Sequence, residues 1–205
     1  FKRIHIHCFH ISIFIRTLFN MDSSPKSICI LRLSAIGDVT HMVPVVRTIQ
    51  KYWPNTELTW IIGKNEASLV NDIPNIEFIE FDKSKNFNSF NNIFRKMKSR
   101  KFDVLLCAQV SFRANIICAL TPASLKLGYD KSRSKNFHSF FINQCIKVTP
   151  QQHILDSFFS FIEYLGLKNR EMNWGYNIPK EAHEFANQYL ARDRFKIIIS
   201  PCSSH

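Results

Sequence analysis

The chain has 205 residues, enough for one well-packed domain with an appendage. Its hydrophobic fraction of 45% and its 19 Phe residues are typical of a globular protein and exclude a disordered one. The net charge of +11 favours polyanionic partners such as nucleic acid, anionic lipid head groups or phosphorylated substrates, without choosing among them.

The first twenty residues superficially resemble a signal peptide or an anchor, because they are apolar and contain basic but no acidic residues. Polar residues interrupt the apolar part, however, and no small-residue cleavage site follows. Met21 opens the segment MDSSPKSICILRL, which looks like a natural start. We therefore expect residues 1–20 to be a non-native or unstructured extension, which N-terminal sequencing of the native protein would test.

Apolar runs and helical patterns alternate along the rest of the chain. Short apolar runs predict strands at 28–33, 58–62, 76–81, 104–107, 126–129, 145–148 and 197–200. Helical spacing predicts helices at 39–53, 65–71, 87–100, 114–120, 153–165 and 181–192. Pro44 predicts that the first helix starts late or kinks in its first turns. The alternation predicts βαβ units and a mainly parallel sheet covered on both faces, with a polar, irregular linker region at 168–179.

Several sequence signatures are missing. With five glycines, the chain contains neither G-x-G-x-x-G nor G-x-x-x-x-G-K-[ST], which speaks against a nucleotide-phosphate site at the first strand. The six cysteines form no C-x-x-C pair, and we interpret them as reduced, mostly buried thiols of a cytosolic protein. The eight histidines lack zinc-ligand spacing, so we predict no metal site, and no apolar run is long enough for a membrane span.

One acidic residue, Asp38, and one basic residue, Arg32, lie at the junction between the first predicted strand and the helix that follows it. The stretch is LRLSAIGDVTHMVP at 31–44. Ligands of open α/β sheets bind at the carboxyl ends of the strands, which is where Asp38 is expected. Two interpretations of Asp38 stay open, a helix N-cap and a general base beside a ligand. Arg32, near the end of a buried strand, needs either Asp38 or an anionic substrate as its partner.

The same stretch, followed by R-T-I-Q-K-Y-W-P-N and L-T-W-I-I-G, resembles the start of the family 9 glycosyltransferases, the ADP-heptose lipopolysaccharide heptosyltransferases. Further matches follow in the expected order: F-D-V-L-L-C-A-Q-V-S-F-R-A-N at 102–115, K-L-G-Y-D at 126–130, H-I-L-D at 153–156 and S-P-C-S-S at 200–204. Within the family, the subgroup that adds the first heptose to Kdo-lipid A fits best.

The resemblance implies a two-domain glycosyltransferase of the B type, in which a Rossmann-like N-terminal domain holds the lipid-linked acceptor and a C-terminal domain holds the nucleotide sugar. We therefore predict an α/β, mainly parallel acceptor-binding domain at 21–178. Residues 179–205 would be a linker helix and the first strand of a truncated donor domain. A fragment of this kind is expected to be inactive alone, because transfer needs two substrates positioned across a cleft.

The resemblance also implies roles for particular residues. Asp38 matches the family's proposed catalytic base, which would take a proton from the acceptor hydroxyl in an inverting transfer. Arg32 stands where the family usually has Lys. The predicted acceptor-binding residues are Arg32, Ser34, Gln109, Arg113, Arg133 and Lys135. Ser203 and Ser204 are the predicted donor-binding residues. Solvated surface charge is the alternative interpretation of the last three acceptor-binding cations.

The implied partners are an ADP-heptose donor and a lipopolysaccharide core acceptor, with no cofactor and no nucleic acid. The implied location is cytoplasmic, in peripheral contact with the anionic inner membrane. One alternative is a family 9 enzyme with another sugar or acceptor. Another is a noncatalytic basic α/β module that binds anionic membrane or nucleic acid through the basic cluster at 95–101, although no nucleic-acid-reading motif is present.

Overall fold

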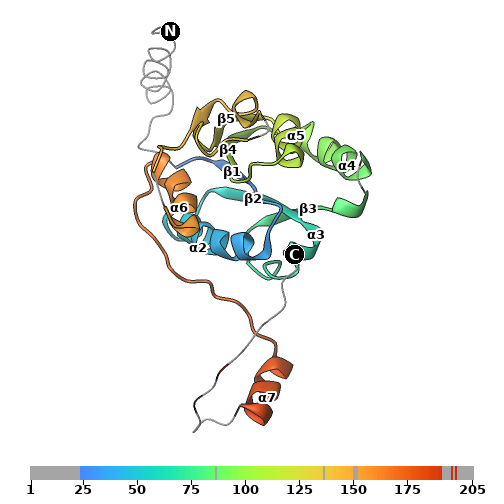
Figure 1. The fold of residues 1–205 in the computed structure, drawn as a ribbon, viewed down its shortest axis with the longest axis vertical. Helices are drawn as coiled ribbons and strands as arrows, with labels where there is room; N and C mark the ends of the chain where they lie inside the picture. The colour runs from blue at the N-terminus through green and yellow to red at the C-terminus, as the bar shows by residue number, and fades with distance from the viewer. Residues whose placement is uncertain are drawn as a thin grey trace. The chain divides into compact units, whose positions relative to one another are not determined.

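The computed structural model describes residues 24–85, 87–135, 137–149, 152–190, 195 and 197. The chain divides into two units, one up to Trp174 and one from Gly175 onward. The first unit contains a six-stranded sheet of order β3-β2-β1-β4-β5-β6, in which every neighbouring pair is parallel (Figure 1). This strand order is that of a Rossmann-like sheet and confirms the predicted fold class.

The strands coincide with the predicted apolar runs to within a few residues. They are β1 (Ser27–Leu31), β2 (Glu57–Gly63), β3 (Glu77–Phe81), β4 (Phe102–Cys107), β5 (Ala123–Gly128) and β6 (Gln144–Cys145). The helices of the first unit are α2 (Ile36–Tyr52), α3 (Lys64–Ala67), α4 (Phe87–Met97), α5 (Phe112–Leu120) and α6 (Ile154–Tyr164), with 3₁₀ turns η1 (Lys83–Lys85) and η2 (His138–Phe140). The predicted strand at 197–200 lies outside the described residues apart from residue 197.

The sheet is buried on both faces, which explains why its strands are continuous apolar runs. In β1, Ile28 and Ile30 belong to the core layer that also contains Trp60 and residues of α2 and α6. The alternate residues Cys29 and Leu31 belong to the second layer, with residues of α4 and α5. Figure 1 shows α2 and α6 on one side of the sheet and α4 and α5 on the other.

Helix α2 begins at Ile36, before the predicted start at residue 39, and Pro44 lies inside it. The late start is therefore wrong, and the alternative of a kink stays a prediction. Proline has no N–H to donate to the carbonyl four residues earlier, which in α2 belongs to Thr40. The indole Nε1 of Trp174 donates to that carbonyl oxygen at 3.0 Å. A second contact follows about two turns further along α2, where the backbone N–H of Glu171 donates to Thr48 Oγ1 at 2.8 Å. The irregular segment after α6 is therefore hydrogen-bonded to α2 at two points. One of these bonds replaces the one that Pro44 cannot donate.

The second unit contains α7 (Lys180–Tyr189), which corresponds to the helix predicted at 181–192. Phe185 and Tyr189 stack along it with ring centroids 4.6 Å apart, and Lys180 pairs with Glu184 at 3.4 Å. None of its residues is buried. Within the described residues of both units, no helix has the length and hydropathy that crossing a membrane requires.

Candidate functional site

The site lies where β1 and β4 end, because these central strands are neighbours and Leu31 pairs with Cys107 at their carboxyl ends. The chain leaves β1 toward α2 on one face of the sheet and leaves β4 toward α5 on the other. Side chains from both exits therefore meet at the position where open α/β sheets bind ligands.

Arg32 connects the segments that follow β1 and β4. Its Nη1 donates to the carbonyl oxygen of Ala108 at 2.6 Å, and its Nη2 forms an ion pair with Asp38. The guanidinium carbon lies 5.3 Å from the ring centroid of Phe158 on α6. Burial lowers the pKa of Arg32, an effect that Asp38 partly offsets, and the group stays charged at neutral pH. Its buried Nε has no hydrogen-bond partner among the described residues.

Asp38 occupies the third position of α2, and Ala35 is the N-cap residue, so Asp38 is not the N-cap. Its Oδ2 accepts hydrogen bonds from the backbone N–H of Ala35 at 3.3 Å and from Arg32. Its Oδ1 accepts none from the described part of the chain. The Asp38 side chain is 29% exposed, against 11% for Arg32, so Arg32 holds a carboxylate that is partly open to solvent.

Gln109 joins the β4 exit to the β1 exit. Its Oε1 accepts from the backbone N–H of Leu33 at 2.7 Å, and its Nε2 lies 3.4 Å from Ser34 Oγ. The carbonyl of Leu33 in turn accepts from the N–H of Gly63 at 3.0 Å, at the end of β2. Hydrogen bonds thus link the ends of β1, β2 and β4. The predicted site residues Ser34 and Gln109 lie next to each other.

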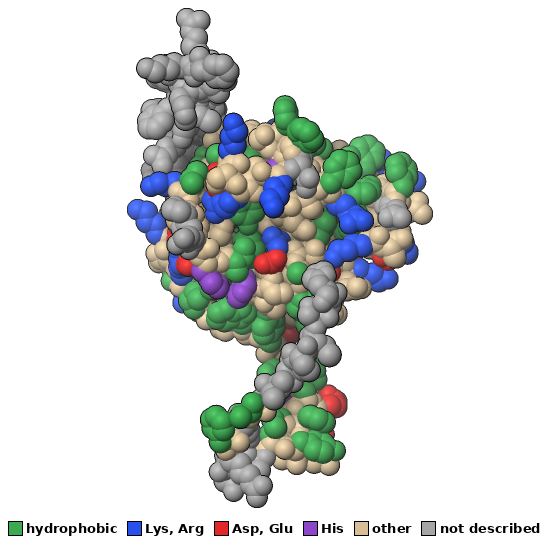
Figure 2. Space-filling model, in the orientation of Figure 1, with side chains coloured by type: hydrophobic (Ala, Val, Ile, Leu, Met, Phe, Trp, Pro, Cys, Tyr) green, Lys and Arg blue, Asp and Glu red, His purple; other side chains and the backbone are tan. Residues whose placement is uncertain are grey.

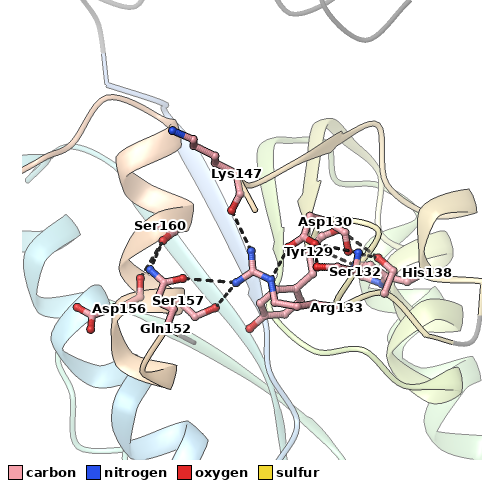
Figure 3. A network of polar contacts seen from close by, with 11 residues as sticks. Tyr129, Asp130, Ser132, Arg133, His138, Lys147, Gln152, Asp156, Ser157 and Ser160 are labelled. Carbon is pink, nitrogen blue, oxygen red and sulfur yellow. Dashed lines mark hydrogen bonds and ion pairs between the residues drawn. The ribbon is translucent and has the colours of Figure 1, made fainter. Parts of the chain in front are cut away.

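Arg133 comes from the loop after β5 and clamps that loop to the start of α6 (Figure 3). Its Nε pairs with Asp130, its Nη1 donates to Ser157 Oγ at 3.0 Å, and its Nη2 donates to the carbonyl of Lys147 at 3.0 Å. The guanidinium also lies over the ring of Tyr129, 5.2 Å from the centroid. Most of its donors are therefore engaged within the protein, which makes Arg133 a structural clamp at the site.

Asp130 and His138 fix the same loop from its buried side. Burial alone would raise the pKa of Asp130, but hydrogen bonds from Ser132 and Arg133 outweigh it and hold that pKa below its usual range. Burial lowers the pKa of His138, so the ring is neutral at pH 7. Its Nε2 accepts from the N–H of Tyr129 at 3.3 Å, so Nδ1 carries the proton and donates to Asn115 Oδ1 at 2.8 Å.

A hollow of about 720 Å³ opens between the β5 loop and the start of α6. Arg32 and Arg133 line it together with hydroxyl and amide groups and with Tyr129. A space of this size admits a sugar, and its lining combines two ion-paired guanidinium groups with apolar side chains such as Val110 and Ile154.

The other predicted site residues are placed differently. Arg113, in the first turn of α5, and Lys135, after β5, are exposed, and neither side chain has a hydrogen-bond or ion-pair partner among the described residues. Both follow strands that end at the same edge of the sheet as β1. Ser203 and Ser204 lie outside the described residues.

Sequence reasoning did not select His41, which lies one helical turn after Asp38. Its buried Nδ1 has no hydrogen-bond partner in the described part of the chain. Its ring stands edge-on to that of His153, at a centroid distance of 5.5 Å, where α6 begins. The spacing of three residues from Asp38 in the helical pattern was the available signal.

The fold is a Rossmann-like α/β domain with an Arg–Asp pair at the carboxyl edge of its parallel sheet. The family model for glycosyltransferase family 9 (heptosyltransferase) matches residues 90–205, and the chain belongs to this family. The chain is 41% identical over 181 residues to the lipopolysaccharide core heptosyltransferase OpsX of Haemophilus influenzae, covering 88% of this chain and 52% of that protein. It is 22% identical over 176 residues to lipopolysaccharide heptosyltransferase 1 of Campylobacter coli. The chain spans about half the length of these relatives.

Solved structures agree on the fold. The glycosyl transferase family 9 protein of Veillonella parvula superimposes with a TM-score of 0.68 at 21% identity, over 82% of this chain and 50% of that one. The E. coli heptosyltransferase WaaC, solved with ADP-2-deoxy-2-fluoro heptose, superimposes with a TM-score of 0.63 at 18% identity, over 73% of this chain and 52% of that one. The fold matches the N-terminal half of B-type heptosyltransferases.

Proposed function

We propose that the chain is the acceptor-binding half of a heptosyltransferase that transfers heptose from ADP-heptose to the Kdo-lipid A inner core of lipopolysaccharide. Family membership supports the class of reaction. The observation that carries the proposal is the Asp38 carboxylate, held through one oxygen by Arg32 and partly exposed at the ligand-binding edge of the sheet.

The proposed chemistry needs one base. An acceptor hydroxyl oxygen forms a bond to the anomeric carbon as the bond from that carbon to the ADP oxygen breaks, with inversion. ADP leaves with the bonding electron pair, and the hydroxyl proton passes to Asp38. Arg32 holds Oδ2, which leaves Oδ1 to accept the proton. ADP is a good leaving group, so the proposal requires no second carboxylic acid in this half of the enzyme.

The acceptor carries carboxylates and phosphates, and charge-assisted hydrogen bonds from cations suit such groups. We assign direct contacts to Arg32, which lines the hollow, and to the exposed Arg113 and Lys135. Arg133 would shape the hollow through its clamp and offer its remaining donor. Ser34 and Gln109 would orient the hydroxyl groups beside Asp38.

The proposed domain organisation is an acceptor domain at 21–178, preceded by an extension at 1–20. Residues 179–205 would lead into a donor domain in which Ser203 and Ser204 contact ADP-heptose. Without that domain the chain would bind acceptor without turning it over, since catalysis depends on positioning both substrates. We place the enzyme at the cytoplasmic face of the inner membrane, where a lipid-linked acceptor is available.

A noncatalytic module that binds membrane or nucleic acid through the basic cluster at 95–101 is the alternative function. This cluster lies between the end of α4 and the start of β4. Strands begin at that edge of the sheet, so the cluster is at the opposite edge from Asp38. The proposed transfer reaction at Asp38 therefore does not involve this basic cluster. Variants at the two edges of the sheet can distinguish the two candidate functions.

Calorimetric titration of the chain tests the proposal with three ligands: the deacylated Kdo-containing inner-core oligosaccharide, ADP-heptose and a polynucleotide. We expect the oligosaccharide to bind and ADP-heptose not to bind. Arg113→Gln should weaken oligosaccharide binding about fivefold to tenfold, whereas Arg95→Gln, at an exposed position in the second half of α4, should leave it unchanged. Binding of ADP-heptose alone, or of polynucleotide but not oligosaccharide, would overturn the proposal.

A further inference from the structure

Exposed aromatic side chains gather at the edge of the sheet that carries Asp38. Phe112 is 68% exposed, Phe137 78% and Phe140 81%, and we call these three residues the aromatic rim. They lie on the segments that follow β4 and β5, two adjacent parallel strands whose carboxyl ends share one edge. Exposed apolar side chains also follow β1, β3 and β6: Ile36, Phe87 and Val148. Clusters of this kind on a surface mark interaction sites.

The aromatic rim is held in place by the protein. His138, between Phe137 and Phe140, is buried and hydrogen-bonded to Asn115 on α5, one turn after Phe112. The rings of Phe137 and Phe140 lie 6.1 Å apart and form one apolar surface. Phe137 has a φ of 60°, a left-handed conformation that is unusual for a bulky residue. The buried His138 thus anchors the loop that carries these two exposed apolar side chains.

Positive charge surrounds the aromatic rim. Arg113, Lys131 and Lys135 lie on the same segments and are exposed. Within 108–115 and 129–141 the only acid is Asp130, which is 2% exposed and paired with Arg133. Figure 2 shows hydrophobic side chains along the upper rim of this face, with Lys and Arg side chains beneath them. Exposed aromatic residues bordered by unpaired cations complement an anionic lipid surface.

We propose that the aromatic rim docks the protein on an anionic phospholipid bilayer, with Phe112, Phe137 and Phe140 entering the head-group region and the neighbouring cations contacting lipid phosphates. A second copy of the chain fits less well, because two such rims would bring like charges together. The inference deepens the proposed function, since docking through this edge brings the Asp38 site to the surface where a lipid-linked acceptor is held.

Vesicle co-sedimentation of the whole chain tests the docking. We expect binding to vesicles containing phosphatidylglycerol, weaker binding to phosphatidylcholine alone, and a decrease with salt. Replacing both Phe137 and Phe140 by Ser should lower partitioning by roughly thirtyfold. The matched control is Phe94→Ser, which removes a half-exposed Phe from the second half of α4 and should change little. Equal losses in both variants, or no loss in the double variant, would overturn the proposal.

A site-resolved measurement separates the rim from any other lipid-binding segment. Brominated lipids should quench the fluorescence that the Phe140→Trp substitution adds. They should not quench the fluorescence that Phe94→Trp adds. Absence of quenching at position 140 would overturn the proposal, as would light scattering that shows a dimer while no vesicle binding occurs. Failure here leaves the binding of the deacylated oligosaccharide in solution intact, so it is distinguishable from failure of the proposed function.

Discussion

At the scale of single residues, the geometry of the site depends on Arg32. Its planar guanidinium reaches the Ala108 carbonyl with one terminal nitrogen and Asp38 with the other, while its face rests on Phe158. Arg can make these contacts together because its donors form a fixed fork, which the single ammonium of Lys does not offer. Arg32 therefore joins the segment after β4, α2 and α6 through one side chain.

Arg32→Met tests this role through stability. We expect the free energy of unfolding to fall by about 2 kcal/mol, because the variant leaves the Ala108 carbonyl and Asp38 without their partner. Urea denaturation measures the change. Arg113→Met, which removes an exposed cation with no partner in the described structure, should stay within about 0.5 kcal/mol of the parent. Equal effects of the two substitutions would contradict the bridging role of Arg32.

At the scale of secondary-structure elements, two local features shape the site. Gly128 ends β5 where His138 packs closely against the backbone. A Cβ at Gly128 would lie 2.4 Å from His138 Nε2 and 2.7 Å from a methyl carbon of Ile142. The loop that carries Arg133 and the aromatic rim can therefore close onto α5 only with glycine at this position.

Gly128→Ala should lower the free energy of unfolding by about 2 kcal/mol, because the added methyl displaces His138 from its hydrogen bonds. Gly37→Ala is the matched control: no atom lies within 4 Å of its added Cβ, and it is in the first turn of α2. Alanine there should stabilise the protein by about 0.5 kcal/mol, since it favours the helix. Denaturant titration of both variants checks the opposite signs, and a tolerated Gly128→Ala would refute the close approach.

The second feature is the cap that Trp174 provides for Pro44. Trp174→Phe should cost about 1 kcal/mol in the parent protein, because the Thr40 carbonyl loses its donor. In a Pro44→Ala background the new N–H of residue 44 can take that carbonyl, so the same substitution should cost clearly less. A double-mutant cycle measures this coupling. Strictly additive effects would show that the indole and Pro44 act independently.

The same elements show what the sequence predicts and what it does not. The strands were predictable because burial on both faces makes each of them a continuous apolar run. The start of α2 was missed, since the compensation for Pro44 comes from Trp174, a contact of 134 positions in separation. Asp38 was one of two partners that the sequence left open for Arg32, and the structure shows the ion pair. The clamp of Arg133 could not be, because its partners Ser157 and Lys147 are brought near only by the tertiary fold.

At the scale of the whole molecule, the candidate site and the basic cluster lie at opposite edges of the parallel sheet. Every described strand ends at the edge that carries Asp38, the hollow and the aromatic rim. The basic cluster at 95–101 lies at the other edge. In the proposed enzyme, the acceptor-facing edge would meet both the donor domain and the bilayer, so that the reacting hydroxyl is presented to ADP-heptose while its lipid remains in the membrane.

In the proposed mechanism Asp38 takes the proton of the acceptor hydroxyl. The rate of heptose transfer, measured on an enzyme that joins this chain to a donor domain, shows whether it does. Asp38→Asn keeps the shape of the side chain and removes its basicity. The account predicts that kcat falls at least about a hundredfold while acceptor affinity changes less than about twofold, and that Glu57→Gln at the opposite edge has no effect. Undiminished transfer by Asp38→Asn would contradict the account and leave Asp38 as a structural partner of Arg32.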